Sequence, residues 1–543
     1  MRDVRLLTRN LLADEMCSRL PRECLGRSVL QREQKSMREH KPQSGARGLV
    51  RLGRLALASA AVLTLALAPQ AAFAQVGTTN LVMSTPQEPP NWDYTVGTAT
   101  AINGVLFLNV IEPLLETQQD GSLKPLLASY EVTPDGLTYT FKLVKAKFHD
   151  GTDFDADDVL YSFEQYKKSP RPEISKTFDA VSNIEKVDAS TVKVTLSRPS
   201  QAFLAGMSGL AGMMLPEGGL DNLAKAPVGT GPFSFGEWKP GIEVDVKRFE
   251  DYHGDKPYFE NVRIRFIGDE IAAVNALMAG DIDLINVLVG DGKERADAVK
   301  ADPKLAVLTT PSNQVNYIAL NAKNPKFADI RVRQAIAHAI NREDIAIGAY
   351  SGFAEPACLF VNPANLPWNS DYCPYPYDPE KAQTLLTEAG VGNLDVELKY
   401  YNISDGPAMS ELLTDELGAV GINVKGASRE LAAYLDEVLG STPNFEMTTL
   451  TGPQTVDSFL CPGWFASACV PEFDEAWNKA DAAVTADEAT ALRKQAVNAF
   501  ADAAWVIPTV AWMDVTYANA KLAGWKPYRS QAEADLRGLH WAE

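Results

Sequence analysis

Four acidic side chains in the second hundred residues have the spacing of a calcium-binding loop. They are Asp153, Asp155, Asp157 and Glu164, at positions 1, 3, 5 and 12 of such a loop. Carboxylate oxygens suit Ca²⁺, but position 6 must turn sharply and needs glycine, whereas this chain has Asp158 there. We therefore expect no metal here; instead, Asp155 caps a helix with Asp157 and Asp158 in its first turn.

The residues that could support catalysis do not form a recognisable constellation. The chain has no G-x-S-x-G, H-E-x-x-H, G-x-G-x-x-G or Walker A segment, and no carboxylate pair has a spacing that marks an acid and a base. The histidines after residue 75 suit turn, surface or packing roles; they are His149, His253, His338 and His540. We predict neither an enzyme nor a cofactor, and a secreted hydrolase is the alternative from another functional class.

Four cysteines follow residue 75, and an even number suggests two disulfides in an oxidising compartment. Three pairings are possible. Pairing of nearest neighbours, Cys358 with Cys373 and Cys461 with Cys469, closes two short loops and is the one we favour. A zinc site is the alternative, but C-x14-C and C-x7-C lack the tight C-x2-C spacing that presents two thiolates from one turn.

The acidic residues belong to a compact pattern between Pro125 and Glu164. It predicts a strand at Ser129–Val132, a turn at Thr133–Gly136, and a second strand with alternating apolar side chains. Asp155 then caps a helix whose apolar residues share one face. The alternating side chains of the second strand are Leu137, Tyr139, Phe141 and Leu143.

This segment resembles the signature of the family 5 extracellular solute-binding proteins, the receptors of ATP-driven importers for peptides, nickel, opines and oligosaccharides. Five further blocks resemble the family in its own order: Val228–Phe233, Trp238–Gly241, Ala276–Leu284, Arg331–Ile336 and Tyr377–Ala382. The resemblance covers nearly all of residues 78 to 540. It implies an α/β, type II-like periplasmic binding protein with two hinged lobes and an extra small α+β domain.

The resemblance also implies how the chain is divided. Lobe one would consist of residues 75–114, 225–308 and 508–543, the extra domain of residues 115–224, and lobe two of residues 309–507. Strand and helix patterns alternate in both lobes, as in α/β proteins.

Several elements of the two lobes are predicted from their own residues. Asp378 and Pro379 start a helix that Gly390 ends, and a strand follows at Leu394–Tyr400. A helix at Ala408–Val420 and a strand from Ile422 complete a pattern that favours a parallel sheet. Further helices are expected at Ala99–Val110, Glu270–Ala279 and Ala489–Ala503. The resemblance implies that Val506–Val510 crosses back to lobe one.

The N-terminus has the features of a secretory signal peptide. Arg51 and Arg54 precede an apolar run of 14 residues, Leu55–Ala68, and the small-residue site Ala72–Ala74 follows. The run is shorter than the roughly 20 residues that span a bilayer, so a membrane anchor is the weaker interpretation. We predict translation from Met37, a leader that ends with cleavage after residue 74, and a periplasmic protein without a lipid anchor, since no cysteine follows the run.

The predicted exported chain is strongly acidic. Loss of residues 1–74 removes 13 of the 51 Lys and Arg and 6 of the 70 Asp and Glu, which leaves 38 against 64 and a net charge of −26. Such a surface repels nucleic acid and anionic lipids. We predict a monomer whose partners are a small-molecule or peptide solute and, from the resemblance, permease membrane subunits with their ATPases.

Candidate solute contacts come from both lobes. The resemblance places the proline-rich loop at residues 86–94 beside the ligand cleft, where Trp92 and Tyr94 would stack on a solute; the alternative is that Trp92 packs the loop down. Peptide-binding members present a carboxylate from a Trp-x-x-Asp segment, but this chain has Leu450–Pro453 there, with Asp457 near enough to substitute. The predicted contacts are Trp92, Tyr94, Tyr401, Asn402, Thr451, Asp457 and Trp464.

The arginine that can hold a peptide's carboxylate in this family is also missing, from Tyr400–Asp405. A buried zwitterion without charge partners would be unfavourable by several kcal/mol. The neutral side chains of Tyr401, Asn402, Thr451 and Trp464 suit a hydroxylated solute or a peptide held by its backbone. The alternative is that they line an ordinary surface without a binding role. We predict a peptide-like or other medium-sized solute, with an oligosaccharide or opine as the alternative.

Overall fold

The computed structural model describes residues 78–118, 121–286, 292–361, 372–402, 405–439, 442–452, 456–461, 466–526 and 534–542. The predicted leader and signal peptide, residues 1–74, lie outside these ranges, as does Trp464. Within the described ranges, no helix combines the length and the apolar character needed to cross a bilayer.

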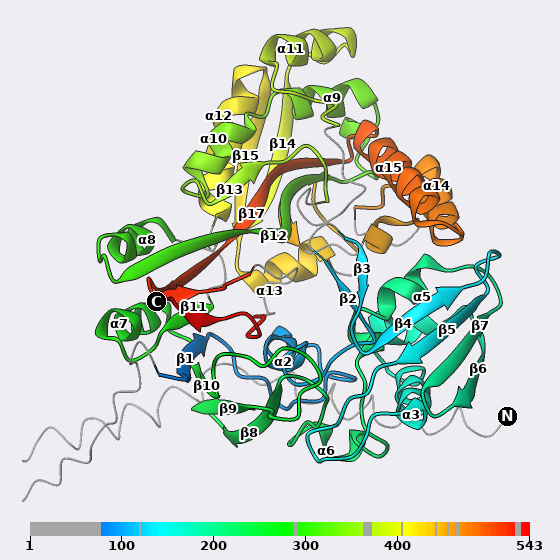
Figure 1. The fold of residues 1–543 in the computed structure, drawn as a ribbon. Helices are drawn as coiled ribbons and strands as arrows, with labels where there is room; N and C mark the ends of the chain where they lie inside the picture. Colours follow the sequence, from blue (N-terminus) through cyan, green and yellow to red (C-terminus); the bar gives the residue numbers. More distant parts are fainter. Residues whose placement is uncertain are drawn as a thin grey trace, which may run out of the picture. The chain divides into compact units, whose positions relative to one another are not determined.

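A mixed sheet of eleven strands is the frame, with β12 (Leu305–Leu320) and β17 (Val506–Asn519) at its centre (Figure 1). One side, called the first half, contains in order β11 (Leu284–Asn286), β1 (Asn80–Thr85), β10 (Asn261–Phe266), β9 (Glu243–Arg248) and β8 (Phe233–Lys239). The other side, called the second half, contains β16 (Met447–Gly452), β14 (Leu394–Tyr401) and β15 (Ile422–Arg429), while β13 (Ala354–Pro356) pairs with β17.

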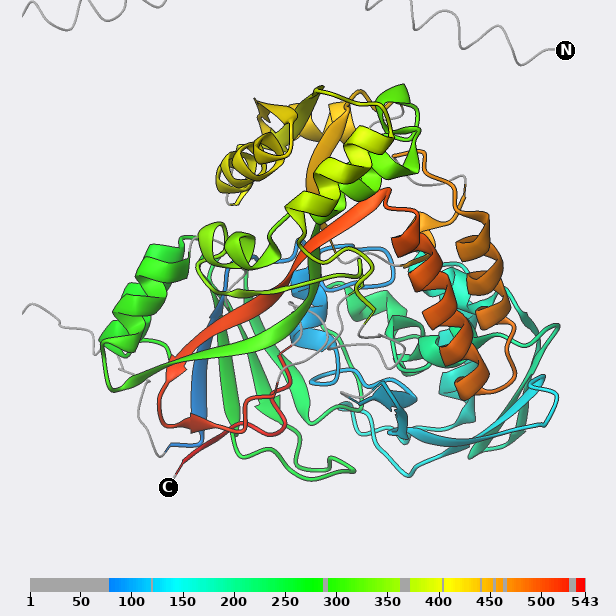
Figure 2. The ribbon, with the colours of Figure 1, turned by 90° about the horizontal axis from the view of Figure 1, so that it is seen from above.

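The central strands β12 and β17 belong to both halves. The first part of β12, Leu305–Pro311, pairs with Met513–Asn519 of β17, which there also pairs with β11. After a register shift, the second part of β12 pairs with Val506–Ala511 of β17 and with β16. The two strands run side by side between the halves (Figure 2), so the predicted return crossing of the chain is confirmed.

Helices accompany the strands of both halves. Those of the first half are α2 (Thr100–Leu106), α7 (Glu270–Ala279) and α8 (Gly292–Lys300). Those of the second half are α9 (Ile330–His338), α10 (Arg342–Gly348), α11 (Pro379–Glu388), α12 (Gly406–Ala419), α13 (Leu431–Tyr434), α14 (Pro471–Asp481) and α15 (Ala486–Asp502). Because β14 is parallel to both β15 and β16, the predicted parallel sheet is confirmed.

The helix expected at Ala99–Val110 is shorter than predicted. It ends at Leu106, since Phe107 is extended and Leu108 has a φ of 62°, a left-handed conformation that cannot continue a right-handed helix. Apolar residues continue past this point because they are buried in the core, so their presence alone does not mark the helix end.

A separate sheet of four strands has the order β4 (Ala128–Val132), β5 (Thr138–Leu143), β7 (Thr191–Leu196) and β6 (Val181–Asp188). Tyr139 and Phe141 of β5 are buried, which confirms the alternation. Helix α3 (Ala156–Tyr166) is capped as predicted, because Asp155 accepts a hydrogen bond from Asp157 N and donates its own N–H to Asp158. The other short elements are β2 (Leu115–Thr117), β3 (Leu123–Pro125), α4 (Pro172–Ser175), α5 (Gln201–Gly206), α6 (Leu220–Leu223), β18 (Leu522–Ala523) and β19 (His540–Trp541).

The apolar side chains form different cores in the two halves. One continuous cluster joins the four-stranded sheet to the first half and includes Leu81 and Phe141. The second half has two clusters of its own, represented by Leu398 and Phe500. Along the crossing strands lies a small cluster of Val315, Ala357 and Ala511. The first half and the four-stranded sheet therefore form one body, and the second half forms another.

Both predicted disulfides are present. The Sγ atoms are 1.99 Å apart in Cys358–Cys373 and 1.91 Å apart in Cys461–Cys469. The first bridge follows β13 and lies next to Ala357 of the small crossing cluster. The pairing of nearest neighbours is confirmed.

Candidate functional site

The carboxyl ends of three parallel strands meet at one edge of the second half. β14 ends at Tyr401 opposite Arg429 at the end of β15, and β16 runs parallel to β14 and ends at Gly452. In open α/β sheets, ligands bind at this edge, where strand ends leave backbone groups and loop side chains available. Three of the predicted contacts, Tyr401, Asn402 and Thr451, lie at this edge.

A buried polar cluster connects this edge to the crossing strands. Asn316 of β12 donates from Nδ2 to Thr451 Oγ1 at 2.8 Å and to Asp405 Oδ2 at 3.3 Å. Its Oδ1 accepts from Thr509 Oγ1 of β17 at 2.8 Å. The hydroxyl of Tyr350 also donates to Asp405. Since buried polar groups must be hydrogen-bonded, this cluster fixes the rotamer of Asn316 and thereby the position of the Thr451 hydroxyl.

The aromatic member of the edge is half-buried. The Tyr401 ring meets Tyr434 edge to face, with ring centroids 5.3 Å apart. Burial raises the pKa of Tyr401 to about 12, with a further contribution from the Asp405 charge, so its hydroxyl stays neutral and can donate a hydrogen bond. Asn402 is exposed, and its Nδ2 donates to Glu430 Oε1 at 2.9 Å.

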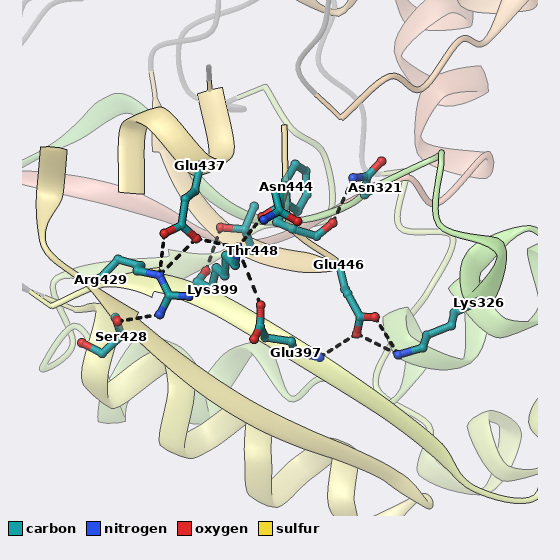
Figure 3. A network of polar contacts seen from close by, with 11 residues as sticks. Asn321, Lys326, Glu397, Lys399, Ser428, Arg429, Glu437, Asn444, Glu446 and Thr448 are labelled. Carbon is teal, nitrogen blue, oxygen red and sulfur yellow. Dashed lines mark hydrogen bonds and ion pairs between the residues drawn. The ribbon is translucent and has the colours of Figure 1, made fainter. Parts of the chain in front are cut away.

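A second polar network holds one wall of the edge in place (Figure 3). Glu437, in the π-helical turn Leu435–Leu439, accepts from Lys399 Nζ at 2.5 Å and from Arg429 Nε at 2.9 Å. The Lys399 side chain is 4% exposed, so its charge is buried next to that of Glu437. The hydrogen bond from Lys399, followed by that from Arg429, holds the pKa of Glu437 below its ordinary value. The turn is therefore tied to β14 and β15 directly behind Tyr401.

The two aromatic residues predicted in the first half do not lie at an exposed surface. Trp92 is fully buried and packs edge to face on Phe235 and Trp238, at centroid distances of 5.2 and 5.7 Å. Tyr94 is also fully buried, and its hydroxyl lies 2.5 Å from that of Tyr166. Both side chains pack the loop against the core, which is the alternative given for Trp92 in the sequence analysis. Neither ring is free to stack on a solute in this structure.

Two other predicted contacts are not tested. The side chain of Asp457 and the whole of Trp464 lie outside the described part of the chain, so both stay predictions. Sequence reasoning missed Asp405, Asn316 and Tyr350. Asp405 has a sequence signal, because it is an acidic residue shortly after the predicted strand, in the same segment Tyr400–Asp405 in which the family's arginine is missing. Asn316 and Tyr350 carry no local signal, since only the fold brings them to Asp405.

Solved structures define the class of protein. The chain is similar to the ABC transporter-associated periplasmic binding protein DppA of Helicobacter pylori, in complex with the peptide STSA, with 25% identity and a TM-score of 0.67 over 87% of this chain and 99% of that chain. It is also similar to the binding protein AgaA of A. tumefaciens R10, in complex with agropinic acid, with 27% identity and a TM-score of 0.66 over 86% of this chain and 99% of that chain. The fold is that of a two-lobed periplasmic binding protein.

The family follows from the sequence comparison. Residues 122–467 match the model of the bacterial extracellular solute-binding proteins, family 5, and the chain belongs to this family. A predicted ABC transporter peptide-binding protein of Brucella ovis is 33% identical over 346 residues, which are 60% of this chain and 64% of that protein. The match thus spans less than two thirds of the length of this curated relative.

Proposed function

We propose that the protein is an extracytoplasmic receptor of an ABC importer. It captures a peptide-like or other medium-sized solute between two lobes and delivers it to the permease membrane subunits and their ATPases. The observation that carries this proposal is the pair of strands β12 and β17, which join two bodies with different hydrophobic cores. Membership of a family of solute-binding receptors supports it.

The mechanism that we propose is hinged closure. The pairing of β12 with β17 shifts register between Pro311 and Val315, next to the small cluster around Val315, and we place the hinge at this interruption. A solute that touches both bodies makes more contacts in the closed form and therefore shifts the equilibrium towards closure. The asparagine and threonine of the polar cluster, Asn316 and Thr509, lie on the crossing strands themselves and link the site to the hinge.

The division of the chain in this proposal follows the predicted lobes. Lobe one comprises residues 75–114, 225–308 and 508–543, the extra domain residues 115–224, and lobe two residues 309–507. The two disulfides support an oxidising, periplasmic location. The proposal includes removal of residues 1–74, a monomeric receptor and no enzymatic activity.

The site favours a solute that is bound by neutral groups. Thr451, Asn402 and Tyr401 offer hydroxyl and amide groups, which suit peptide backbones as well as hydroxylated solutes. Asp405 is 6% exposed and bonded to Tyr350 and Asn316, so it acts by orienting Asn316. Peptide is supported by the Brucella ovis relative, and an opine, the alternative, by the agropinic acid complex of AgaA.

A thermal-shift screen tests the function. The exported protein, residues 75–543, is incubated with short peptides, oligosaccharides, opines and nickel, and a bound solute raises Tm because it binds only the folded form. Small-angle scattering then checks that the radius of gyration falls with the same solute. Cleavage of peptides or glycosides by the purified protein, without a rise in Tm, would support the hydrolase instead.

Replacement of Thr451 tests the site. Thr451→Val keeps the shape but removes the hydroxyl that Asn316 holds, so we expect the solute identified in the screen to bind about tenfold more weakly. Thr384→Val on α11 is the matched control, because Thr384 is exposed and its hydroxyl donates to Glu380 O of its own helix. Equal affinities of the two variants would place the solute elsewhere.

A further inference from the structure

The two bodies also touch away from the crossing strands. Asp481, the last residue of α14 in the second half, accepts a hydrogen bond from the backbone N of Ala202 in α5 at 2.9 Å. The same carboxylate forms an ion pair with Arg198 Nη1 at 2.8 Å and accepts from Ser200 Oγ at 3.2 Å. A single carboxylate of the second half therefore binds three donors that precede or begin α5.

Neighbouring groups extend this contact. Gln201 Nε2 donates to Ala483 O at 2.9 Å. The turn between β4 and β5 lies close as well, because a Cβ atom on Gly136 would be 3.5 Å from Val484 Cγ1. The Asp481 and Arg198 side chains are 28% and 54% exposed, so water reaches the contact and it can open without exposing a core.

The partners belong to bodies with different cores. Phe203 of α5 lies in the cluster shared by the four-stranded sheet and the first half. Phe473 of α14 lies in a cluster of the second half. The chain passes between these bodies through β12 and β17, so a rotation about those strands changes the distance between α5 and α14.

We propose that Asp481 and residues 198–202 form a latch that stabilises the arrangement described above, in which the two bodies touch at α5 and α14 and which we call closed, whether or not a solute is present. The latch rests on the proposed hinge movement but goes beyond it, because it needs no solute contact. It sets the fraction of empty receptor that is closed, and therefore how much solute-binding energy is needed for closure. Since the ion pair is partly exposed, salt weakens the latch.

The test uses the exported protein without solute. Asp481→Ala removes the acceptor of all three donors and should shift the closed-to-open ratio by about three- to tenfold towards open. Small-angle scattering should then give a larger radius of gyration than for the wild type. Raising NaCl should enlarge the wild type in the same direction and leave Asp481→Ala unchanged. Arg198→Ala should have a smaller effect and add little to Asp481→Ala.

The matched control is Glu475→Ala on the same helix. It breaks the exposed pair between Glu475 and Lys479, 2.6 Å apart, which lies within α14. An unchanged radius of gyration in folded Asp481→Ala, or an equal expansion in Glu475→Ala, would overturn the latch. The same measurements separate the latch from the proposed function. If Asp481→Ala expands but no solute raises the Tm of the wild type, the latch is supported and the receptor function is not. If a solute raises the Tm but Asp481→Ala does not expand, the receptor function is supported and the latch is not.

Discussion

His149 shows how one half-buried side chain ties a family motif to the core. Its Nδ1 accepts from Gly229 N at 3.3 Å, and its Nε2 donates to Gly231 O at 2.9 Å, so a neutral imidazole satisfies both ends of the glycine-rich turn. The turn needs glycine, because a Cβ on Gly229 would lie 2.1 Å from Val110 O. Burial lowers the pKa of His149 to about 4.

This lowered pKa predicts a loss of stability in acid. Between pH 6.5 and pH 4 the unfolded chain binds a proton that the native His149 does not, so its stabilising contribution is complete above pH 6.5 and falls as pH falls. His149→Gln should reduce the decrease in unfolding free energy between pH 7.5 and pH 5 by about 2 kcal/mol. Denaturant unfolding at both pH values measures it.

The exposed His540 provides the control for this measurement. His540→Gln is measured in the same way, and the effect is assigned to His149 where it exceeds that of His540→Gln. The comparison between variants is needed because Glu416 changes the unfolding free energy with pH in the opposite direction. Burial raises the pKa of Glu416 to about 7, so this carboxyl stabilises the native state below its unfolded pKa and loses that contribution as pH rises through 7. Identical pH dependence in His149→Gln and the wild type would contradict the assignment.

The sequence predicted individual residues well where the cause was local. Asp155 caps its helix as expected, because a cap depends on a few consecutive residues. Trp92 was ambiguous, since its burial depends on Phe235 and Trp238 far along the chain. Asp405 was missed for the same reason: its partners Tyr350 and Asn316 reach it only through the fold.

Among the elements, the π-helical turn Leu435–Leu439 depends most on a single side chain. It lies at the carboxyl edge of β14 and β15, and Glu437 is its ionic tie to both strands. Tyr434, just before it, adds a hydrogen bond from its hydroxyl to Thr449 O at 2.6 Å. The segment supports the half-buried ring of Tyr401 from behind.

We expect Glu437→Gln to loosen this turn. The variant leaves the buried Lys399 ammonium without its closest carboxylate, which should destabilise the protein by about 2 kcal/mol. Hydrogen exchange should become faster at the described residues 431–439. Glu185→Gln, which removes an exposed pair with Lys193 on the four-stranded sheet, is the control and should change neither quantity. Unchanged exchange in Glu437→Gln would show that the ion pairs of Glu437 do not hold the turn.

Elements with regular patterns were predicted closely. The helix Glu270–Ala279 has its predicted ends, because Asp269 caps it and Gly280 closes it with a φ of 78°. The C-terminal end of α2 was predicted wrongly, because the apolar residues that follow the helix are buried in the core and resemble a continuation of it. The crossing of β12 and β17 came from the family resemblance, because no local pattern states which strands pair.

At the scale of the whole molecule, one of the two disulfides lies close to the crossing strands. The bridge Cys358–Cys373 follows β13, which pairs with β17, and Arg342 Nε in the same region donates to Ala357 O and Pro508 O at 3.0 and 2.9 Å. The bridge Cys461–Cys469 precedes α14 and lies away from the crossing strands in sequence. The two bridges therefore support different parts of the second half.

We predict that removal of the first bridge destabilises the protein more than removal of the second. A bridge across about 15 residues contributes about 3 kcal/mol, and a shorter loop contributes less. Thermal unfolding of Cys358→Ser/Cys373→Ser and of Cys461→Ser/Cys469→Ser measures the difference. Mass spectrometry of the wild type should detect no free thiol in the exported chain. Free thiols in the purified protein would contradict both bridges.

The central position of β17 has a consequence for biogenesis. β1, near the start of the described chain, and β11, in its middle, lie in a sheet that is completed only when residues 506–519 have been made, so the first body cannot finish folding until almost the entire polypeptide has been synthesised. Such long sequence separations slow folding. If the chain is exported as proposed, the late synthesis of β17 keeps the first body unfolded, and therefore able to pass through a membrane, until nearly the whole chain has been made.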